Sequence, residues 1–407
     1  MSLVLPRSSA QRLLMWSVLC AVAAGMGVFA VAPRTLLIGF GHPLLAGAVH
    51  LFTLGGLVGT HYVLQERMLV RVYGEPGPWR PARWTVALLH LVGLAVMTYG
   101  FFTQNWPVVY LGGHYLLPTA IALSFVRAAT ALWRRPAGRP RNAAVLLPGL
   151  GLLAVMALGA MLVLDAYRGG YGFYGLAGIL LHLLSGMFLF YLPLVLLGDL
   201  LQKGDEPPDT GPALLPTAVA ALGVLAAAYG AAGMGGEWGW PLGLAVLGGV
   251  AMWVGLPAFG SPMHRSSATA FAPVRRMPWS AFGVLLLFAA IRHWRGMPAV
   301  EGLTLATFGV LLFFAAVALP DALSRLNFRL PATGAPGQPP PDFAWTAGHY
   351  VVHLVAAGLL LGASLSNSPL LVRLGAALWL GALLSQAVRL WQLESEEAPA
   401  SPPLPPT

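Results

Sequence analysis

Charged residues are scarce in this chain. Asp, Glu, Lys and Arg together make up 9% of its 407 residues, whereas soluble domains carry about 25%. So few charged side chains do not cover a water-facing surface, which excludes an ordinary soluble enzyme. The net charge is +9, but the arginines fall between apolar runs. They therefore indicate membrane topology, and no nucleic-acid partner is predicted.

Cysteine is almost absent as well. Cys20 is the only one and lies inside the first apolar run, which excludes a disulfide framework and a CxxC metal or redox pair. The sequence also lacks the HExxH zinc motif, the phosphate-binding Walker loop and the nucleophile elbow of hydrolases. These absences leave open whether the protein is an enzyme.

Long apolar runs are abundant. Hydrophobic residues make up 57% of the chain and the mean hydropathy is +0.73, while a bilayer core requires about 20 consecutive apolar residues. We therefore predict an all-α, polytopic membrane bundle of about twelve transmembrane helices in one domain, residues 1–397, with lipid as its surroundings. The first run is too long for a signal peptide and no small-residue cleavage site follows it. The predicted spans are 13–33, 43–64, 84–103, 108–130, 146–166, 173–198, 212–232, 239–258, 278–292, 299–320, 345–364 and 370–391.

The basic residues predict the orientation. With twelve spans and a cytoplasmic N-terminus, 18 of the 23 basic residues fall on the inner side, as expected for cytoplasmic loops. We predict a multi-pass protein of the inner (plasma) membrane with both termini cytoplasmic. The Pro/Gly-rich segments 331–342 and 398–407 are predicted to be a cytoplasmic loop and a disordered tail. The five basic residues on the outer side are Arg34, Arg168, Arg292, Arg295 and Arg373.

Histidine is a frequent ionisable residue inside the predicted spans. Asp, Glu and Lys are almost absent from them. Ionisable groups at membrane depth are costly and usually face a functional interior. Neutral imidazole is the cheapest of them to bury and binds metals readily. This pattern favours haem or copper over a relay of carboxylates. Eight of the ten histidines lie in or beside spans: His42, His50, His61, His90, His114, His182, His349 and His353.

The depths of these histidines suggest a shared site. His50, His114 and His182 are predicted in the outer third to half of the bilayer, and we name them as haem or metal ligands. His349 and His353 share a helix face through their i,i+4 spacing and are candidate metal ligands in the inner half, where His61 and His90 also fall. His50 and His61 would lie within about 20° of one face and about 16 Å apart on a regular helix.

Each of these histidines also has a simpler explanation. A single histidine in a membrane helix often hydrogen-bonds a neighbouring helix without binding a metal. His264 and His293 lie in predicted loops, where solvation explains them.

Two segments resemble the haem-copper oxidase subunit I superfamily, in particular its short relatives and the NnrS family. The stretch HPLLAGAVHLFTLGGLVGTHYVLQERML, residues 42–69, resembles the second helix of that superfamily. His50, followed by Leu-Phe-Thr-Leu-Gly, matches the position of a haem-iron ligand. GILLHLLSGMFLFYLPLVLLGDLL resembles the sixth helix, where His182 takes the copper-side position. The resemblance implies an oxidase-like bundle with both termini inside.

The chain departs from that superfamily at the oxygen-reducing site. Gly186 stands where oxygen-reducing members have a tyrosine, and the predicted seventh and tenth spans contain no histidine. The chain therefore lacks the histidines that would supply three imidazoles to copper in the way usual for that superfamily. We expect no standard oxygen-reducing binuclear centre.

What remains is a site for one haem b, with copper as a second candidate metal. Two imidazoles on one iron, His50 with His114 or His182, would serve electron transfer to a membrane or periplasmic partner. One imidazole alone would leave the iron open to a small gas such as nitric oxide. Arg292 and Arg295 are candidate partners for the haem carboxylates, although interfacial anchoring also explains them.

Two other functions fit the sequence. The protein is a transporter or channel if the histidines line a polar path, which the many Gly and Pro residues would permit through broken helices. Alternatively, it is an assembly factor or degenerate subunit that keeps the fold without the chemistry.

Overall fold

The computed structural model describes most of the chain. The described residues are 9–36, 42–73, 80–134, 143–167, 173–201, 211–231, 238–256, 271–296, 310, 313, 318 and 343–396. The predicted tenth span, the 331–342 loop and the 398–407 tail lie outside these ranges, apart from three single residues in the span. Within the described part every regular element is helical and no strand occurs. The prediction of an all-helical protein is confirmed.

The first half of the chain forms six helical rods, three of them interrupted by π-helix. The first rod is α1, and η1 is a short 3-10 turn that follows it. The second, fourth and sixth rods each change from α-helix to π-helix and back without a break. The elements are α1 (Ser9–Val31), η1 (Pro33–Leu36), α2 (Pro43–His50), η2 (Leu51–Val58), α3 (Gly59–Tyr73), α4 (Arg80–Phe102), α5 (Trp106–Tyr110), η3 (Leu111–Leu116), α6 (Leu117–Trp133), η4 (Ala143–Leu146), α7 (Leu147–Tyr167), α8 (Phe173–Ser185), η5 (Gly186–Tyr191) and α9 (Leu192–Leu201).

The described elements of the second half are α-helices without a π segment inside them. Three of them follow one another beyond α9, and a helical hairpin closes the described part of the chain. Asn367 takes a left-handed conformation, with φ of 51°, in the tight turn of that hairpin. The elements are α10 (Gly211–Ala231), α11 (Gly239–Gly255), α13 (Phe271–Trp294), α16 (Phe343–Ser366) and α17 (Pro369–Glu396).

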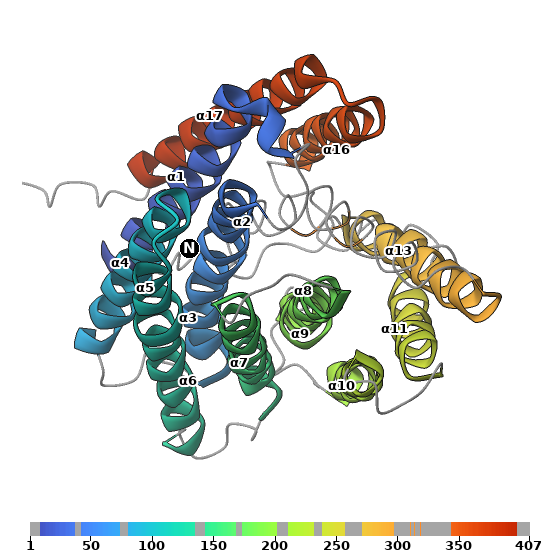
Figure 1. Ribbon diagram of the computed structural model, residues 1–407. Coiled ribbons are helices and arrows are strands. Elements are labelled where there is room, and N and C mark those ends of the chain that lie inside the picture. Colours follow the sequence, from blue (N-terminus) through green and yellow to red (C-terminus); the bar gives the residue numbers. More distant parts are fainter. Residues whose placement is uncertain are drawn as a thin grey trace, which may run out of the picture.

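Neighbours in the chain are neighbours in space. Each rod from α1 to α13 packs against the next one, and α17 packs against both α16 and α1. Figure 1 shows the result, with the rods from α1 to α7 on one side, α8 and α9 near the middle, and α10, α11 and α13 on the other side. The second rod also packs against the fourth and the sixth, so it lies next to both of the other rods that carry a cavity histidine.

The helices begin and end close to the predicted spans, but two extend more than five residues beyond them at one end. The second rod continues to Tyr73 and α13 begins at Phe271, beyond the limits that hydropathy alone suggests. The extension of the second rod carries Glu66 into the bundle, where it is 6% exposed. Glu66 lies beyond the predicted span 43–64, and two arginines there compensate the charge of this buried carboxylate.

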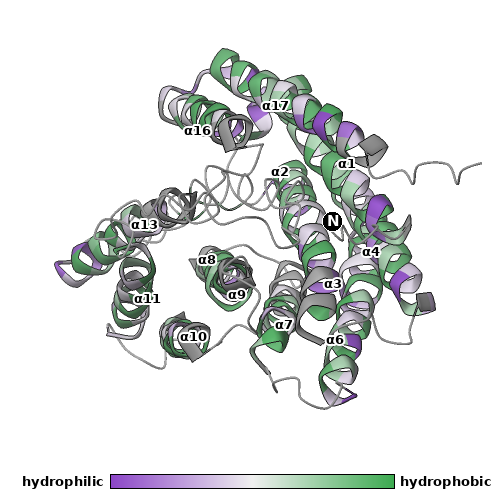
Figure 2. Cartoon of the chain, turned by 180° about the vertical axis from the view of Figure 1, so that it is seen from behind, coloured by the Kyte–Doolittle hydropathy of each residue, from purple (hydrophilic) through white to green (hydrophobic). Residues whose placement is uncertain are grey.

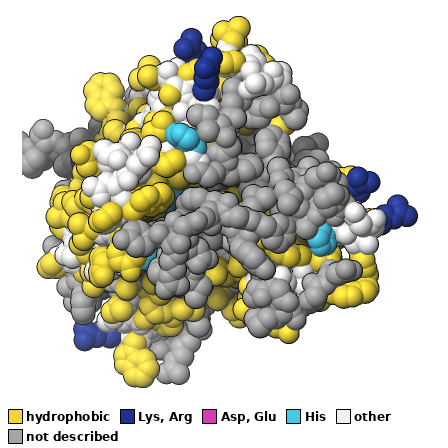
Figure 3. Space-filling view, viewed as in Figure 1, with side chains coloured by type: hydrophobic (Ala, Val, Ile, Leu, Met, Phe, Trp, Pro, Cys, Tyr) yellow, Lys and Arg dark blue, Asp and Glu magenta, His cyan; other side chains and the backbone are white. Residues whose placement is uncertain are grey.

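The surface of the bundle suits lipid. Large apolar side chains are exposed along the helices, for example Leu222 and Leu225 on α10 and Leu384 on α17, each more than 60% exposed. Figure 2 shows hydrophobic residues along most of each helix, and in Figure 3 Lys and Arg lie at the edges of the visible face. Among the described residues, six helices are long and apolar enough to cross a membrane: 10–31, 43–66, 81–102, 106–133, 177–197 and 369–392. The number twelve stays a prediction.

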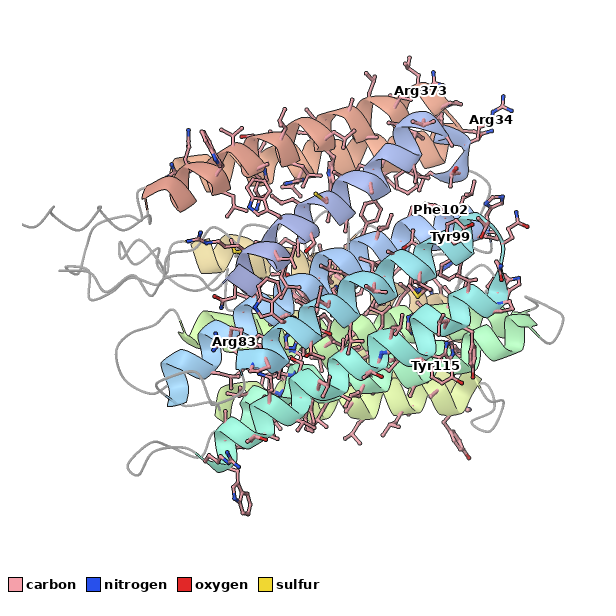
Figure 4. All side chains as sticks on the ribbon, turned by 90° about the vertical axis from the view of Figure 1, so that its left-hand side faces the viewer. Arg34, Arg83, Tyr99, Phe102, Tyr115 and Arg373 are labelled. Atoms are coloured by element: carbon pink, nitrogen blue, oxygen red, sulfur yellow. The ribbon has the colours of Figure 1, made fainter. Side chains whose placement is uncertain are left out.

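The two ends of the bundle carry exposed aromatic and basic side chains. Figure 4 places Arg34 and Arg373 at one end, together with Tyr99 and Tyr115, and Arg83 toward the other. We call these the Arg34 end and the Arg83 end. Aromatic residues at such positions are typical of the two membrane interfaces.

Candidate functional site

One cavity of about 210 Å³ lies between the second to sixth rods, and His50, His114 and His182 all line it. Counted in the same way, one water needs only about 10 to 15 Å³. The three histidines follow the starts of their rods, at Pro43, Trp106 and Phe173, by seven, eight and nine residues. They therefore lie at a similar depth below the Arg34 end. The structure brings the three predicted ligands of the outer group together.

His50 is oriented by its own helix. Its Nδ1–H donates to the carbonyl oxygen of Ala46 at 2.7 Å, since a carbonyl can only accept. The proton on Nδ1 leaves the lone pair of Nε2 available, which is the usual arrangement of an iron- or zinc-binding histidine. Phe101 stacks on the imidazole ring, with ring centroids 5.0 Å apart and an angle of 22° between the planes. Both contacts hold the ring in one position.

His182 faces the same cavity from α8. Its Nδ1 is buried and has no hydrogen-bond partner among the described residues. The ring lies against Gly159 of α7, where the lack of a side chain makes room for it. His182 and His50 are close enough for their charges to interact.

His114 is the third imidazole of the cavity. Both its ring nitrogens are buried and without a partner in the described part of the chain. Its ring stacks on Tyr110, with centroids 4.1 Å apart and planes 15° apart. Buried polar atoms normally find a partner. An unsatisfied imidazole beside a cavity is therefore consistent with a ligand that the protein binds there.

A π-helical segment follows or contains each of the three histidines. η2 begins directly after His50, η3 contains His114, and η5 begins four residues after His182. π-Helix is rare and is often found at functional sites. Each segment contains glycine, and the backbone of Gly112 packs closely on α4, since a Cβ there would lie 2.5 Å from the Met97 nitrogen. The glycines beside the histidines are the sequence signal that hydropathy overlooks.

The π-helix also alters the relation between His50 and His61. The predicted common face assumes a regular α-helix between them, whereas residues 51–58 have wider turns. His50 lines the cavity, and His61 packs instead on the edge of Phe190, with ring centroids 5.4 Å apart. Phe190 itself lines the cavity. His61 therefore lies behind the cavity wall, separated from it by one aromatic ring.

The cavity histidines surround a space and do not gather at one point. In the described part of the chain no three His, Cys, Asp or Glu side chains are grouped to hold a metal ion. Such spacing suits a ligand that lies between the imidazoles. Copper binding by His50, His114 and His182 stays a prediction.

Arg292 and Arg295 lie at the end of α13 and are exposed. None of the residues lining the cavity comes from α13. Beside them, Trp294 packs on Trp238, with ring centroids 4.8 Å apart. Their role toward haem carboxylates stays a prediction, and their surroundings are those of an interfacial anchor.

His349 and His353 form a pair on α16, away from the cavity. Their ring centroids are 4.5 Å apart, as their spacing predicts. His349 Nε2–H donates to the Ala382 carbonyl at 2.7 Å, while both nitrogens of His353 are buried without a partner among the described residues. Trp379 contacts the His353 ring, with centroids 4.8 Å apart. Metal binding at this pair stays a prediction.

Below the cavity, toward the Arg83 end, α3 carries a column of buried polar groups. His61 and Tyr62 lie one turn beyond Val58, which lines the cavity. The Tyr62 ring touches His90, with centroids 5.1 Å apart. The Tyr62 hydroxyl and the Nδ1 atoms of both histidines are buried without a partner in the described residues.

The column ends at a small pocket around Glu66. Arg83 Nε lies 3.0 Å from one carboxylate oxygen of Glu66, and Arg127 contacts the other. Ser124 donates to the side-chain oxygen of Gln65 in the same pocket. Glu66 thus joins α3, α4 and α6. Sequence reasoning missed this network because each residue lies near the end of a predicted span.

Comparisons with known proteins identify no relative. No protein-family model, no curated protein and no solved structure matches this chain. The case for a function therefore depends on the residues and geometry described above.

Proposed function

We propose that this protein is an integral membrane protein that binds haem b in the cavity between its second and sixth rods and takes part in electron transfer. His50 and His182 are the residues that would hold the haem iron. The observation that carries the proposal is the convergence of three histidines at one depth on one cavity. The resemblance of residues 42–69 and of the sixth rod to oxidase subunit I and the NnrS family supports it.

The residues present fit a haem. Apart from the histidines, Thr53 and Trp106, the cavity is lined by apolar side chains and glycines, and such apolar walls suit a porphyrin ring. His50 presents Nε2, because its Nδ1 is already bonded to Ala46. His182 has a buried nitrogen without a partner among the described residues. When bound, haem would supply a one-electron change of charge at its iron.

The surrounding side chains support that role. Phe101 stacks on the His50 ring and holds it in position. Gly159 has no side chain, which leaves room for the His182 ring. The apolar walls exclude water, and burial is one of the factors that set the reduction potential of a haem. With His50 and His182 both holding the iron, the site would serve electron transfer. Nitric-oxide handling would instead require that only one of the two histidines hold the iron.

The optical spectrum of the purified protein tests the proposal. The protein is expressed with a haem precursor, purified in detergent and measured by pyridine haemochrome assay and by absorption and electron paramagnetic resonance. We expect about one haem b for each chain, in a low-spin state. His50→Ala should lower the haem content more than tenfold, while His90→Ala, which removes a buried histidine outside the cavity lining, should retain it. Purified protein without a Soret band, even after haem is supplied, would refute haem binding.

A high-spin spectrum that responds to nitric oxide would favour gas handling over electron transfer. Metal analysis of the same samples tests copper. In both variants of the proposal we place the protein in the inner (plasma) membrane with cytoplasmic termini, with a membrane or periplasmic protein as its electron-transfer partner.

A second function, transport along a histidine-lined path, is favoured by the polar column below the cavity. The cavity, His61 with Tyr62, and the Glu66 pocket follow one another along a single rod. Loading vesicles with a zinc indicator and adding Zn²⁺ outside tests this function. Uptake that His61→Ala abolishes and that haem depletion leaves unchanged would support transport. Equal uptake in vesicles with and without the protein would exclude it for this ion.

A further inference from the structure

A second feature of the molecule lies on its outer wall, where η1 packs against α17 at the Arg34 end. Arg34 of η1 and Arg373 of α17 are both exposed. Figure 4 shows them at the same corner of the bundle. Neither guanidinium has a carboxylate or hydrogen-bond partner among the described residues. This corner therefore carries two positive charges, and no described residue supplies a negative charge to compensate them.

The helix end adds to this positive charge. Arg373 follows the first residue of α17, Pro369, by four positions, and the first turn of α17 contains no acidic residue. The N-terminal end of a helix carries a partial positive charge, where acidic groups are favourable and basic groups are not. An anion bound at this corner would remove the unfavourable interaction.

The surface around the two arginines is apolar. Val31 at the end of α1 is 83% exposed, and Leu370 and Leu374 on α17 are 64% and 48% exposed. An apolar surface beside a basic corner matches a molecule with a charged head and hydrocarbon chains. A soluble anion such as free phosphate would use the arginines and leave the apolar residues uncovered.

We propose that this corner binds an anionic phospholipid. Arg34 and Arg373 hold the phosphate, since guanidinium groups form paired hydrogen bonds with phosphate oxygens. The acyl chains lie against Val31, Leu370 and Leu374. The site is separate from the haem cavity, and its existence does not depend on the proposed function.

Lipid binding to the full-length protein tests this site. The delipidated protein is titrated with phosphatidylglycerol, and bound lipid is counted by native mass spectrometry. Phosphatidylcholine and inorganic phosphate serve as comparison ligands. We expect phosphatidylglycerol to bind most tightly, and the double variant R34Q/R373Q to bind it about 10- to 30-fold more weakly, given the contribution of each basic residue to anionic lipid binding.

The double variant R134Q/R389Q is the matched control, because it removes the same charge at the opposite end of the bundle. It should bind phosphatidylglycerol as the unmodified protein does. Equal loss in both double variants would reduce the effect to net charge and overturn the proposal. Equal binding of phosphatidylcholine, or full displacement by inorganic phosphate at the concentration of the lipid, would also overturn it.

Discussion

A Cβ atom on Gly159 would lie 2.9 Å from Cε1 of His182. That separation is shorter than side-chain carbons normally adopt, so the hydrogen atom at Gly159 is what lets the imidazole lie at the cavity wall. Gly249 of α11 does not line the cavity, and a Cβ there would meet nothing within 4 Å. Of these two glycines, only Gly159 makes room for the His182 ring.

Gly159→Ala should therefore weaken haem binding although it removes no donor. Overpacking of this kind typically costs about 1 to 3 kcal/mol, which corresponds to an affinity roughly 5- to 150-fold lower. Haem titration of the apoprotein measures the change. Gly249→Ala is the matched control and should bind haem as the unmodified protein does, because Gly249 does not line the cavity. Equal affinity in both variants would show that the contact with His182 does not matter for the ligand.

Replacing His50 leaves a space that a free imidazole can occupy. In His50→Ala, we expect added imidazole to restore the low-spin spectrum, because the Ala46 contact and the Phe101 ring shape a site of that size. His182→Ala should behave similarly. His114→Ala should keep the low-spin spectrum without added imidazole. If His114→Ala instead lost the low-spin spectrum and His182→Ala kept it, then His114, and not His182, would be the second iron ligand.

Glu66→Gln should destabilise the bundle near the Arg83 end. The change leaves Arg83 and Arg127, whose side chains are 13% and 9% exposed, without a compensating charge. Removing one partner from a buried pair costs about 3 to 5 kcal/mol, and the residual exposure of the arginines places the effect toward the lower value. Thermal unfolding in detergent measures it.

A double-mutant cycle separates this pairing from the loss of Glu66 alone. Combining Glu66→Gln with Arg127→Gln should lose less stability than the two single changes added together. Additive losses would show that the carboxylate and the guanidinium do not interact energetically.

The orientation of the bundle can be measured with single cysteines. In a Cys20→Ser background, Arg34→Cys and Trp133→Cys place one thiol at each end, and both native side chains are exposed, Trp133 to 87%. A maleimide that does not cross membranes should label Arg34→Cys in intact cells and Trp133→Cys only after the cells are opened. The reverse pattern would contradict the predicted cytoplasmic termini.

The sequence alone determined where the helices lie, because hydropathy is a local property that the bilayer requires of each segment. It also determined the common depth of His50, His114 and His182, since their helices start at the same end and rise by a constant 1.5 Å per residue. These predictions needed no knowledge of which helices touch.

Only the tertiary structure decided which way the histidines face. The direction of a side chain depends on the rotation of its helix, and the π segments beside all three histidines change that rotation in a way that a period of 3.6 residues does not anticipate. Packing likewise decided that Glu66 is buried between two arginines and that Arg292 and Arg295 stand apart from the cavity lining. Contacts between distant segments arise from the shape of the whole bundle, and hydropathy along one segment does not contain that information.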